Sequence, residues 1–561
     1  FDICTLVVLF LLYKHFSMDI AQGTVQGQNA TDGDYVTFFG IPYAGDVDGE
    51  NRFKAAPPAP SLQTLFIANN PNIACAQPTP DGLVGEENCL VINIMTKNTT
   101  GQRPVMVWIN GYHYTTGTNQ GLNFRRFVEQ EDILVVTLNY RLSIFGFLCL
   151  GIEEAPGNAG LRDVISGLRW VRDNIAAFGG NPNNVLLVGH GSGAAMVDLI
   201  TLSPLSNGLV HKAILQSGNS LSPWAVSYEP IENAKAFGAA LGFDETNIED
   251  LAINLRNTPI TVLENVLNQF NFRNNIALFA PCVENEIEST EMFLSEAPFE
   301  IIRSGNYVSI PMIIGYTNKE GSLRVKEAME NNWLRLMDHN FDQFIQPDIS
   351  TTNDIVDDIR RFYFEDRSIN FKSIEDYLNY HGDTMILVSS IRAAAERAKT
   401  SKGAIRLYEF GFIGDWSAEW PYPINLNGAR HGHELVYLFE TGTVIAGGSV
   451  NEKMRDSLVQ RWANFAKNNV IVSCFSVPES NTSRHIPWPQ VTDILQQLEY
   501  MQVTENMNFE LVKINPHEQR MKFWNEIYEN HYVAPRPVSN VKRVVFNLFL
   551  VLSLVILVII L

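Results

Sequence analysis

Short apolar runs of strand length alternate with helical patterns through most of this chain. Val185–Val188 precedes a glycine-rich turn, and the apolar periodicity of Leu161–Phe178 is that of a helix. Further runs of the same kind are Val105–Ile109, Ile133–Leu138, Ala213–Gln216 and Pro311–Gly315. Strands that are apolar on both faces and separated by helices predict a large, mostly parallel central sheet with helices on both faces. Such an α/β fold places its ligand chemistry at the carboxyl ends of the strands.

The two ends of the chain carry apolar segments of a different kind. Ile3–Tyr13 has the length of a signal-peptide core and is too short to span a bilayer, so we expect residues 1–18 to be a secretory leader whose start is missing. Residues 19–532 are expected to form one domain, and residues 533–543 a short stalk. Residues 544–561 form an apolar tail, for which we expect membrane attachment. Because Lys542 and Arg543 precede this tail, a glycolipid anchor is favoured over a spanning helix.

Composition restricts the partners. The chain has 61 acidic and 41 basic residues and a net charge of −20, which argues against nucleic acid. Sequons at Asn29, Asn98 and Asn481 are expected glycosylation sites and agree with passage through the secretory route. We expect the extracellular face of the plasma membrane as the final location.

Several longer motifs occur together and in order. They are Phe39–Ala44, Glu87–Leu90, Asn139–Leu142, Gly157–Asp163, Trp170–Pro182 and Gln216–Gly218. In this arrangement the chain closely resembles the type B carboxylesterase family, which includes the cholinesterases and the non-catalytic proteins neurotactin, neuroligin, gliotactin and glutactin. The resemblance runs from about Gly23 to Tyr532 and implies one α/β-hydrolase domain.

The family hydrolyses esters with a serine, a glutamate and a histidine in that chain order, and the serine occupies the centre of G-x-S-x-G. The corresponding segment here is Gly189–Gly193, in which Gly191 stands at the nucleophile position. The resemblance implies that Glu320 is the acid of the triad and that His431 is the base. Ser192 follows one residue later, where the family usually has alanine.

The glycines that supply the family's oxyanion donors are also changed. Gly111 is retained, whereas Tyr112 and His113 replace the next two glycines. We expect their large side chains to fill the space above Gly191 and to weaken the stabilisation of a developing negative charge.

One disulfide can be predicted from the positions of the cysteines. The spacing of Cys75 and Cys89, together with the resemblance around Glu87–Leu90, predicts a disulfide between them. Cys149, Cys282 and Cys474 lie among apolar residues and are expected to be buried thiols, with a second bridge left undecided.

These changes lead to the prediction of a catalytically inactive surface protein that acts in recognition, adhesion or ligand binding. The expected partner is another protein or a small ligand in the former active-site pocket, and no cofactor or metal is expected. A homodimer through the helical pattern near Phe523–Tyr532 is left open. The alternative hypothesis is a carboxylic ester hydrolase of unusual geometry that uses Ser192 with His431 and Glu320.

Overall fold

A computed structural model describes most of the chain between its two ends. The described residues are 16–79, 82–243, 247–267, 270, 275–288, 290–416, 420–441, 449–468, 488–492, 498–504, 509–512 and 516–538. Cys474, Asn481, most of the expected leader and the apolar tail lie outside these residues.

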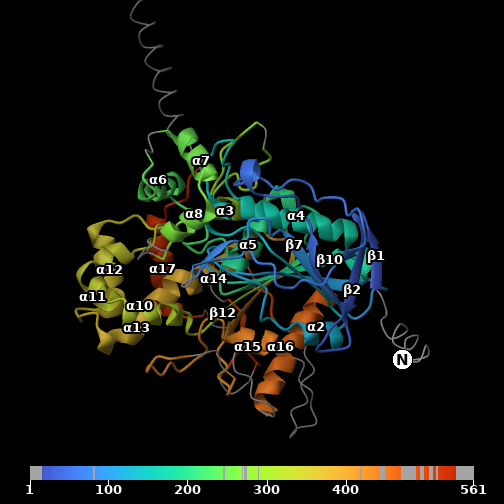
Figure 1. The fold of residues 1–561 in the computed structure, drawn as a ribbon. Coiled ribbons are helices and arrows are strands. Elements are labelled where there is room, and N and C mark those ends of the chain that lie inside the picture. The colour runs from blue at the N-terminus through green and yellow to red at the C-terminus, as the bar shows by residue number, and fades with distance from the viewer. Residues whose placement is uncertain are drawn as a thin grey trace, which may run out of the picture.

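One large twisted sheet runs through the middle of the molecule (Figure 1). Its strands follow the order β1-β2-β3-β7-β9-β8-β10-β11-β12-β13-β14-β15, and β4 pairs with β2. The pairs from β9 to β14 are parallel, whereas the two edges of the sheet are antiparallel. The strands are β1 (Phe16–Ile20), β2 (Gly23–Asn29), β3 (Val36–Pro42), β4 (Phe66–Ile67), β7 (Val91–Thr96), β8 (Arg103–Ile109), β9 (Leu134–Leu138), β10 (Gly180–His190), β11 (Lys212–Gln216), β12 (Met312–Thr317), β13 (Ile405–Phe410), β14 (Tyr500–Val503) and β15 (Phe509–Val512).

Helices pack against both faces of this sheet. Alternation along β8 sends Val105 and Val107 into the core shared with α5, and Met106 and Trp108 into a second core on the opposite face. In Figure 1, α2, α15 and α16 lie below the sheet and α4 lies above it. The principal helices are α2 (Arg125–Glu129), α3 (Ser143–Phe147), α4 (Ala159–Asn174), α5 (Ser192–Leu202), α6 (Pro230–Ala240), α7 (Ile248–Asn257), α8 (Ile260–Leu267), α9 (Pro298–Ser304), α12 (Asn353–Phe364), α13 (Ile374–Gly382), α14 (Val388–Thr400), α15 (His433–Phe439), α16 (Ser449–Asn468) and α17 (Glu518–His531). The predicted two-sided, mostly parallel sheet is confirmed.

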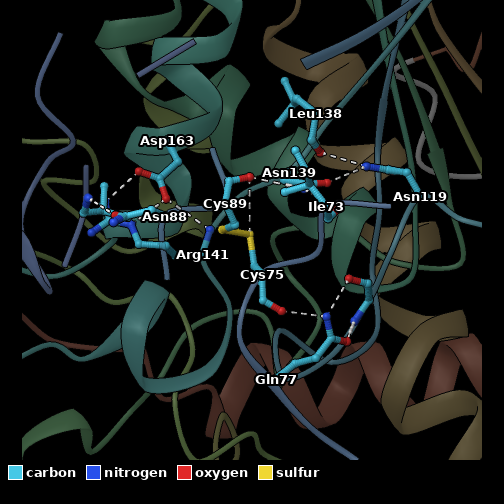
Figure 2. The surroundings of a disulfide bond; sticks show 12 residues. Ile73, Cys75, Gln77, Asn88, Cys89, Asn119, Leu138, Asn139, Arg141 and Asp163 are labelled. Atoms are coloured by element: carbon cyan, nitrogen blue, oxygen red, sulfur yellow. Dashed lines mark hydrogen bonds and ion pairs between the residues drawn. A yellow bond between two sulfur atoms is a disulfide. The ribbon is translucent and has the colours of Figure 1, made fainter. Parts of the chain in front are cut away.

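Among the described residues, two disulfides tie loops to this framework. The predicted bridge between Cys75 and Cys89 is present. Figure 2 shows it beside Asn139, whose side-chain amide donates hydrogen bonds to Cys89 O (3.2 Å) and to Ile73 O (2.9 Å). The second bridge joins Cys149 to Cys282, so these two cysteines are buried as expected, but they form the bridge that the sequence left undecided and are not thiols. The two cysteines are 133 residues apart in the chain, and only the fold brings them together.

Removal of the second bridge should destabilise the protein more than removal of the first. Chain entropy assigns about 5 kcal/mol to the closure of a loop of this length and about 3 kcal/mol to the loop between Cys75 and Cys89. We therefore expect Cys149→Ala/Cys282→Ala to lower the thermal midpoint further than Cys75→Ala/Cys89→Ala does. Calorimetry of the two double variants under matched conditions measures the difference, and the reverse order would contradict the prediction.

Two of the predicted glycosylation sites, and the presence of membrane-spanning helices, can be checked in the described residues. Asn29 and Asn98 are exposed, as an acceptor of glycan must be. Within the described ranges, no helix combines the length and apolar character needed to cross a membrane.

Candidate active site

A sharp turn joins β10 to α5 at the carboxyl edge of the sheet. Gly191 forms this turn with φ 57° and ψ −124°, a conformation that costs glycine little and a side chain more. Its N–H donates to Gln216 O on β11 at 2.8 Å. Among the described residues other than its chain neighbours, a Cβ placed on Gly191 would meet one atom within 4 Å, His431 Nε2 at 3.9 Å. The turn therefore has the shape of a nucleophile elbow and faces a histidine.

The histidine is held by a buried carboxylate. Glu320 follows β12, and its Oε2 lies 2.6 Å from His431 Nδ1. Its other oxygen, Oε1, accepts hydrogen bonds from Ser217 Oγ (2.6 Å) and from Thr317 N (2.7 Å). The Glu320 side chain is 1% exposed and that of His431 is 17% exposed. When Nδ1–H donates to Glu320, Nε2 carries a lone pair and can act as a base.

The backbone of His431 is fixed as well. Its N–H donates to Ser322 Oγ at 2.9 Å, and the preceding residue, Arg430, forms a parallel bridge with Lys319. The structure thus brings together Gly191, Glu320 and His431, which are far apart in the sequence, in the arrangement that the resemblance implies.

The segment after β8 retains backbone donors despite its large side chains. Tyr112 is 68% exposed, so our expectation that it fills the space above Gly191 was wrong. Gly111 remains glycine because a Cβ there would lie 2.1 Å from Gly193 N. His113 adopts a left-handed conformation (φ 57°), which keeps the backbone course that a glycine would allow. Among the described residues, no protein atom accepts a hydrogen bond from the N–H of Tyr112 or His113.

Ser192 supplies one further N–H group. It is the first residue of α5, and the N–H groups of a helix's first turn have no acceptor within the helix. Together with Tyr112 and His113, it presents backbone N–H groups of the kind that stabilise an oxyanion. Its hydroxyl is directed elsewhere: Ser192 Oγ accepts a hydrogen bond from Tyr114 N at 3.2 Å, and the side chain is buried.

Two further histidines lie beside His431 and are neutral near pH 7. Desolvation lowers the pKa of His113 to about 4, with a smaller contribution from Arg324. Desolvation likewise places the pKa of His190 well below its usual range, and the proximity of His431 adds to the effect. The rings of His190 and His431 lie 4.6 Å apart between centroids.

Glu434 is a buried carboxyl group behind this site. Its Oε1 lies 3.5 Å from Gln216 Nε2, and the residue is 1% exposed. Desolvation, and to a smaller extent the negative charge of Glu320, raise its pKa to about 8. Glu434 is therefore protonated at neutral pH.

This shift predicts a pH-dependent loss of stability. Between the ordinary carboxyl pKa and about pH 8, Glu434 ionises in the unfolded chain but keeps its proton in the folded protein, so stability falls as pH rises. Glu434→Gln should remove this loss, which is on the order of 4 kcal/mol across the window. Unfolding midpoints at pH 5 and pH 8 measure it, with Glu526→Gln, on the exposed side of α17, as the control. Parallel pH dependence in both variants would contradict the assignment.

The sequence reasoning missed three members of the site. Ser217 was noticed only as part of a motif, although its hydroxyl holds Glu320. His190 was treated as a bulky residue in a tight turn, and Glu434 was not considered. Their roles come from contacts between distant segments. Within the described residues there is no cluster of three or more His, Cys, Asp or Glu side chains that could hold a metal ion.

The fold and the site define an α/β-hydrolase with an elbow, a glutamate–histidine pair and backbone donors. The model of the Carboxylesterase family matches residues 14–524, and the chain belongs to this family. Esterase B1 of Culex pipiens is 30% identical over 462 residues, covering 78% of this chain and 84% of the relative. Juvenile hormone esterase of Heliothis virescens is 28% identical over 465 residues, covering 77% and 81%.

A solved structure agrees with these relatives. It is juvenile hormone esterase from Manduca sexta with OTFP covalently attached, and it covers 92% of this chain and 100% of its own. The TM-score is 0.81 and the sequence identity 27%.

These comparisons overturn the prediction of an inactive protein for recognition or adhesion. Esterase FE4 of Myzus persicae, juvenile hormone esterase of Heliothis virescens and esterase B1 of Culex pipiens are named as esterases. Physically, the prediction gave too much weight to one missing side chain and two large ones. The base and its carboxylate are in contact, the N–H groups of Tyr112 and His113 have no acceptor among the described residues, and Tyr112 is exposed. The two disulfides and these relatives agree with passage through the secretory pathway.

Proposed function

We propose that this protein is a carboxylic ester hydrolase whose general base is His431. The observation that carries the proposal is the 2.6 Å contact of Glu320 with His431 Nδ1, which turns Nε2 toward the elbow at Gly191. The bound ester would place its carbonyl carbon near Nε2 and its carbonyl oxygen toward the N–H groups of Tyr112, His113 and Ser192. Glu320 keeps the imidazole in one tautomer and stabilises the cation that forms when it takes a proton.

The chemistry of the relatives supports carboxylic esters as the substrate class. Two of those named above are called juvenile hormone esterases, and we extend to this chain only the ester bond that they share. A series of p-nitrophenyl esters of increasing acyl length, assayed with the purified protein, tests the proposal and measures the preferred acyl size. Hydrolysis no faster than in buffer for every ester would refute it.

Removal of the charge on Glu320 should lower the rate strongly. Glu320→Gln keeps the shape of the side chain but loses the carboxylate that orients and stabilises His431. We expect kcat to fall by about 10²–10⁴. A matched control is available in a second buried pair, in which Glu409 Oε2 lies 2.6 Å from His517 Nε2. Glu409→Gln should leave kcat within about threefold of the unmodified protein, and equal losses in the two variants would assign the effect to stability instead.

The location of the enzyme is a further part of the proposal. We place it on the extracellular face of the membrane, with the apolar tail 544–561 acting as the signal that is exchanged for a glycolipid anchor. Release of the protein from intact cells by a phosphatidylinositol-specific phospholipase would support this anchor. Retention with an intact C-terminus would favour a spanning helix. Self-association through the region of α17 is tested by sedimentation of the purified ectodomain.

A further inference from the structure

At the elbow of this chain, the base His431 faces Gly191, which has no side chain. Apart from its chain neighbours His190 and Ser192, the only described atom within 4 Å of a Cβ built on Gly191 is His431 Nε2, at 3.9 Å. A side chain on residue 191 would extend from this Cβ, so the space beside Gly191 lies within reach of the base. The nucleophile that His431 activates must occupy this space or come from a neighbouring hydroxyl.

The neighbouring hydroxyls are engaged in other contacts. Ser192 Oγ accepts from Tyr114 N (3.2 Å), and Ser322 Oγ accepts from His431 N (2.9 Å). Ser217 Oγ donates to Glu320 Oε1 (2.6 Å), on the far side of the carboxylate from the histidine. Among the described residues, none of these hydroxyls forms a hydrogen bond with His431 Nε2. Each serine has a structural role in place of a nucleophilic one.

A second polar atom lies next to His431. His190 is 8% exposed, and its Nε2 is itself buried without a hydrogen-bond partner among the described residues. Its ring packs 4.6 Å from that of His431, and a Cβ on Gly432 would meet His190 Nε2 at 3.6 Å. A neutral imidazole nitrogen can donate or accept one hydrogen bond, and a bound water molecule needs two or more polar partners. His431 and His190 offer two such partners at the elbow.

We propose that the nucleophile of this enzyme is a water molecule held beside Gly191 by His431 and His190. The inference rests on the ester hydrolase function proposed above and specifies how that site works. The water oxygen forms a bond to the ester carbonyl carbon while His431 Nε2 takes one of its protons. The tetrahedral intermediate then breaks its bond to the alcohol oxygen, which receives the proton from His431. The products are one carboxylic acid and one alcohol, and no acyl group is attached to the protein.

The absence of an acyl-enzyme has a direct chemical signature. When esters of one acid share an acyl-enzyme, water and hydroxylamine compete for the same intermediate, so the ratio of hydroxamate to acid is independent of the leaving group. When water attacks the bound ester directly, water and hydroxylamine both react with the ester itself. The ratio of hydroxamate to acid then changes with the leaving group of that ester. We expect this ratio to differ between the p-nitrophenyl, phenyl and methyl esters of butyric acid, after subtraction of a His431→Ala blank. A constant ratio would overturn the proposal.

Mass spectrometry provides an independent measurement. Protein quenched in acid during turnover of p-nitrophenyl butyrate should retain its unmodified mass, and incubation with a fluorophosphonate should leave the elbow peptide unlabelled. A butyryl or phosphonyl group on Ser192, or on any other residue in proportion to enzyme, would overturn the proposal.

Occupation of the space beside Gly191 should stop the reaction. Gly191→Ala adds a methyl group 3.9 Å from His431 Nε2, and we expect kcat to fall by about 100-fold or more because the base loses access to water. Gly208→Ala is the control, since Gly208 also has a positive φ (73°) but no described atom outside its chain neighbours lies within 4 Å of its Cβ position. Full activity of a folded Gly191→Ala protein would overturn the proposal.

The outcomes separate this inference from the function on which it rests. If the unmodified protein shows no His431-dependent hydrolysis, the ester hydrolase function fails, and this mechanism fails with it. If hydrolysis depends on His431 but proceeds with a constant product ratio or a covalent adduct, the function stands and only the water mechanism is wrong.

Discussion

Replacement of His431 by alanine is expected to lower kcat for ester hydrolysis by about 10²–10⁴, nearly to the rate in buffer. His431 Nε2 is the basic atom that faces the elbow, and its orientation depends on the 2.6 Å contact with Glu320. Without the imidazole, water has no acceptor for its proton and the leaving alcohol has no donor. The N–H groups of the oxyanion site remain, so a small residual rate should persist.

The matched control uses the second glutamate–histidine pair. His517→Ala removes the imidazole that lies against Glu409 and should change the thermal midpoint without a comparable loss of kcat. Added imidazole should restore part of the activity of His431→Ala, because the deletion opens space beside Glu320. A His431→Ala protein with the circular dichroism spectrum and the activity of the unmodified chain would contradict the assigned role.

Substitution Gly191→Ser is expected to convert the enzyme into one that reacts through a covalent intermediate. A side chain at this position points at His431 Nε2, and the φ and ψ of Gly191 are those of a strained elbow that already exists in this fold. The hydroxyl would then be activated as a serine nucleophile is in the family. We expect kcat/KM to rise by about 100-fold and a stoichiometric burst of nitrophenolate to appear.

Labelling by a fluorophosphonate measures the change directly. The unmodified protein and Gly191→Ala should not react at the elbow, whereas Gly191→Ser should be labelled at residue 191. The double variant Gly191→Ser/His431→Ala should lose this reactivity, because the hydroxyl depends on the base. A folded Gly191→Ser protein that is neither labelled nor more active would show that the elbow does not present residue 191 to His431.

The pattern of apolar residues along the chain determined the α/β architecture. Apolar runs such as Val105–Ile109 and Val185–Val188 are buried on both faces, and this property is visible residue by residue, so the parallel sheet could be predicted. The motifs around Gly191, Glu320 and His431 could also be recognised in the sequence, because each motif is a short continuous segment. The bridge between Cys75 and Cys89 followed from a short loop and a local motif.

Only the tertiary structure decided which side chains meet and where they point. Tyr112 could fill the site or face solvent, and the identity of the residue does not determine the direction of its side chain. The bridge between Cys149 and Cys282, the contact of Ser217 with Glu320 and the burial of Glu434 each join segments that are distant in the chain. Such contacts depend on how the strands and helices pack, and packing is a property of the whole fold. The prediction of inactivity failed for this reason: it was made from residues taken singly, whereas the base and the backbone donors act through their arrangement in space.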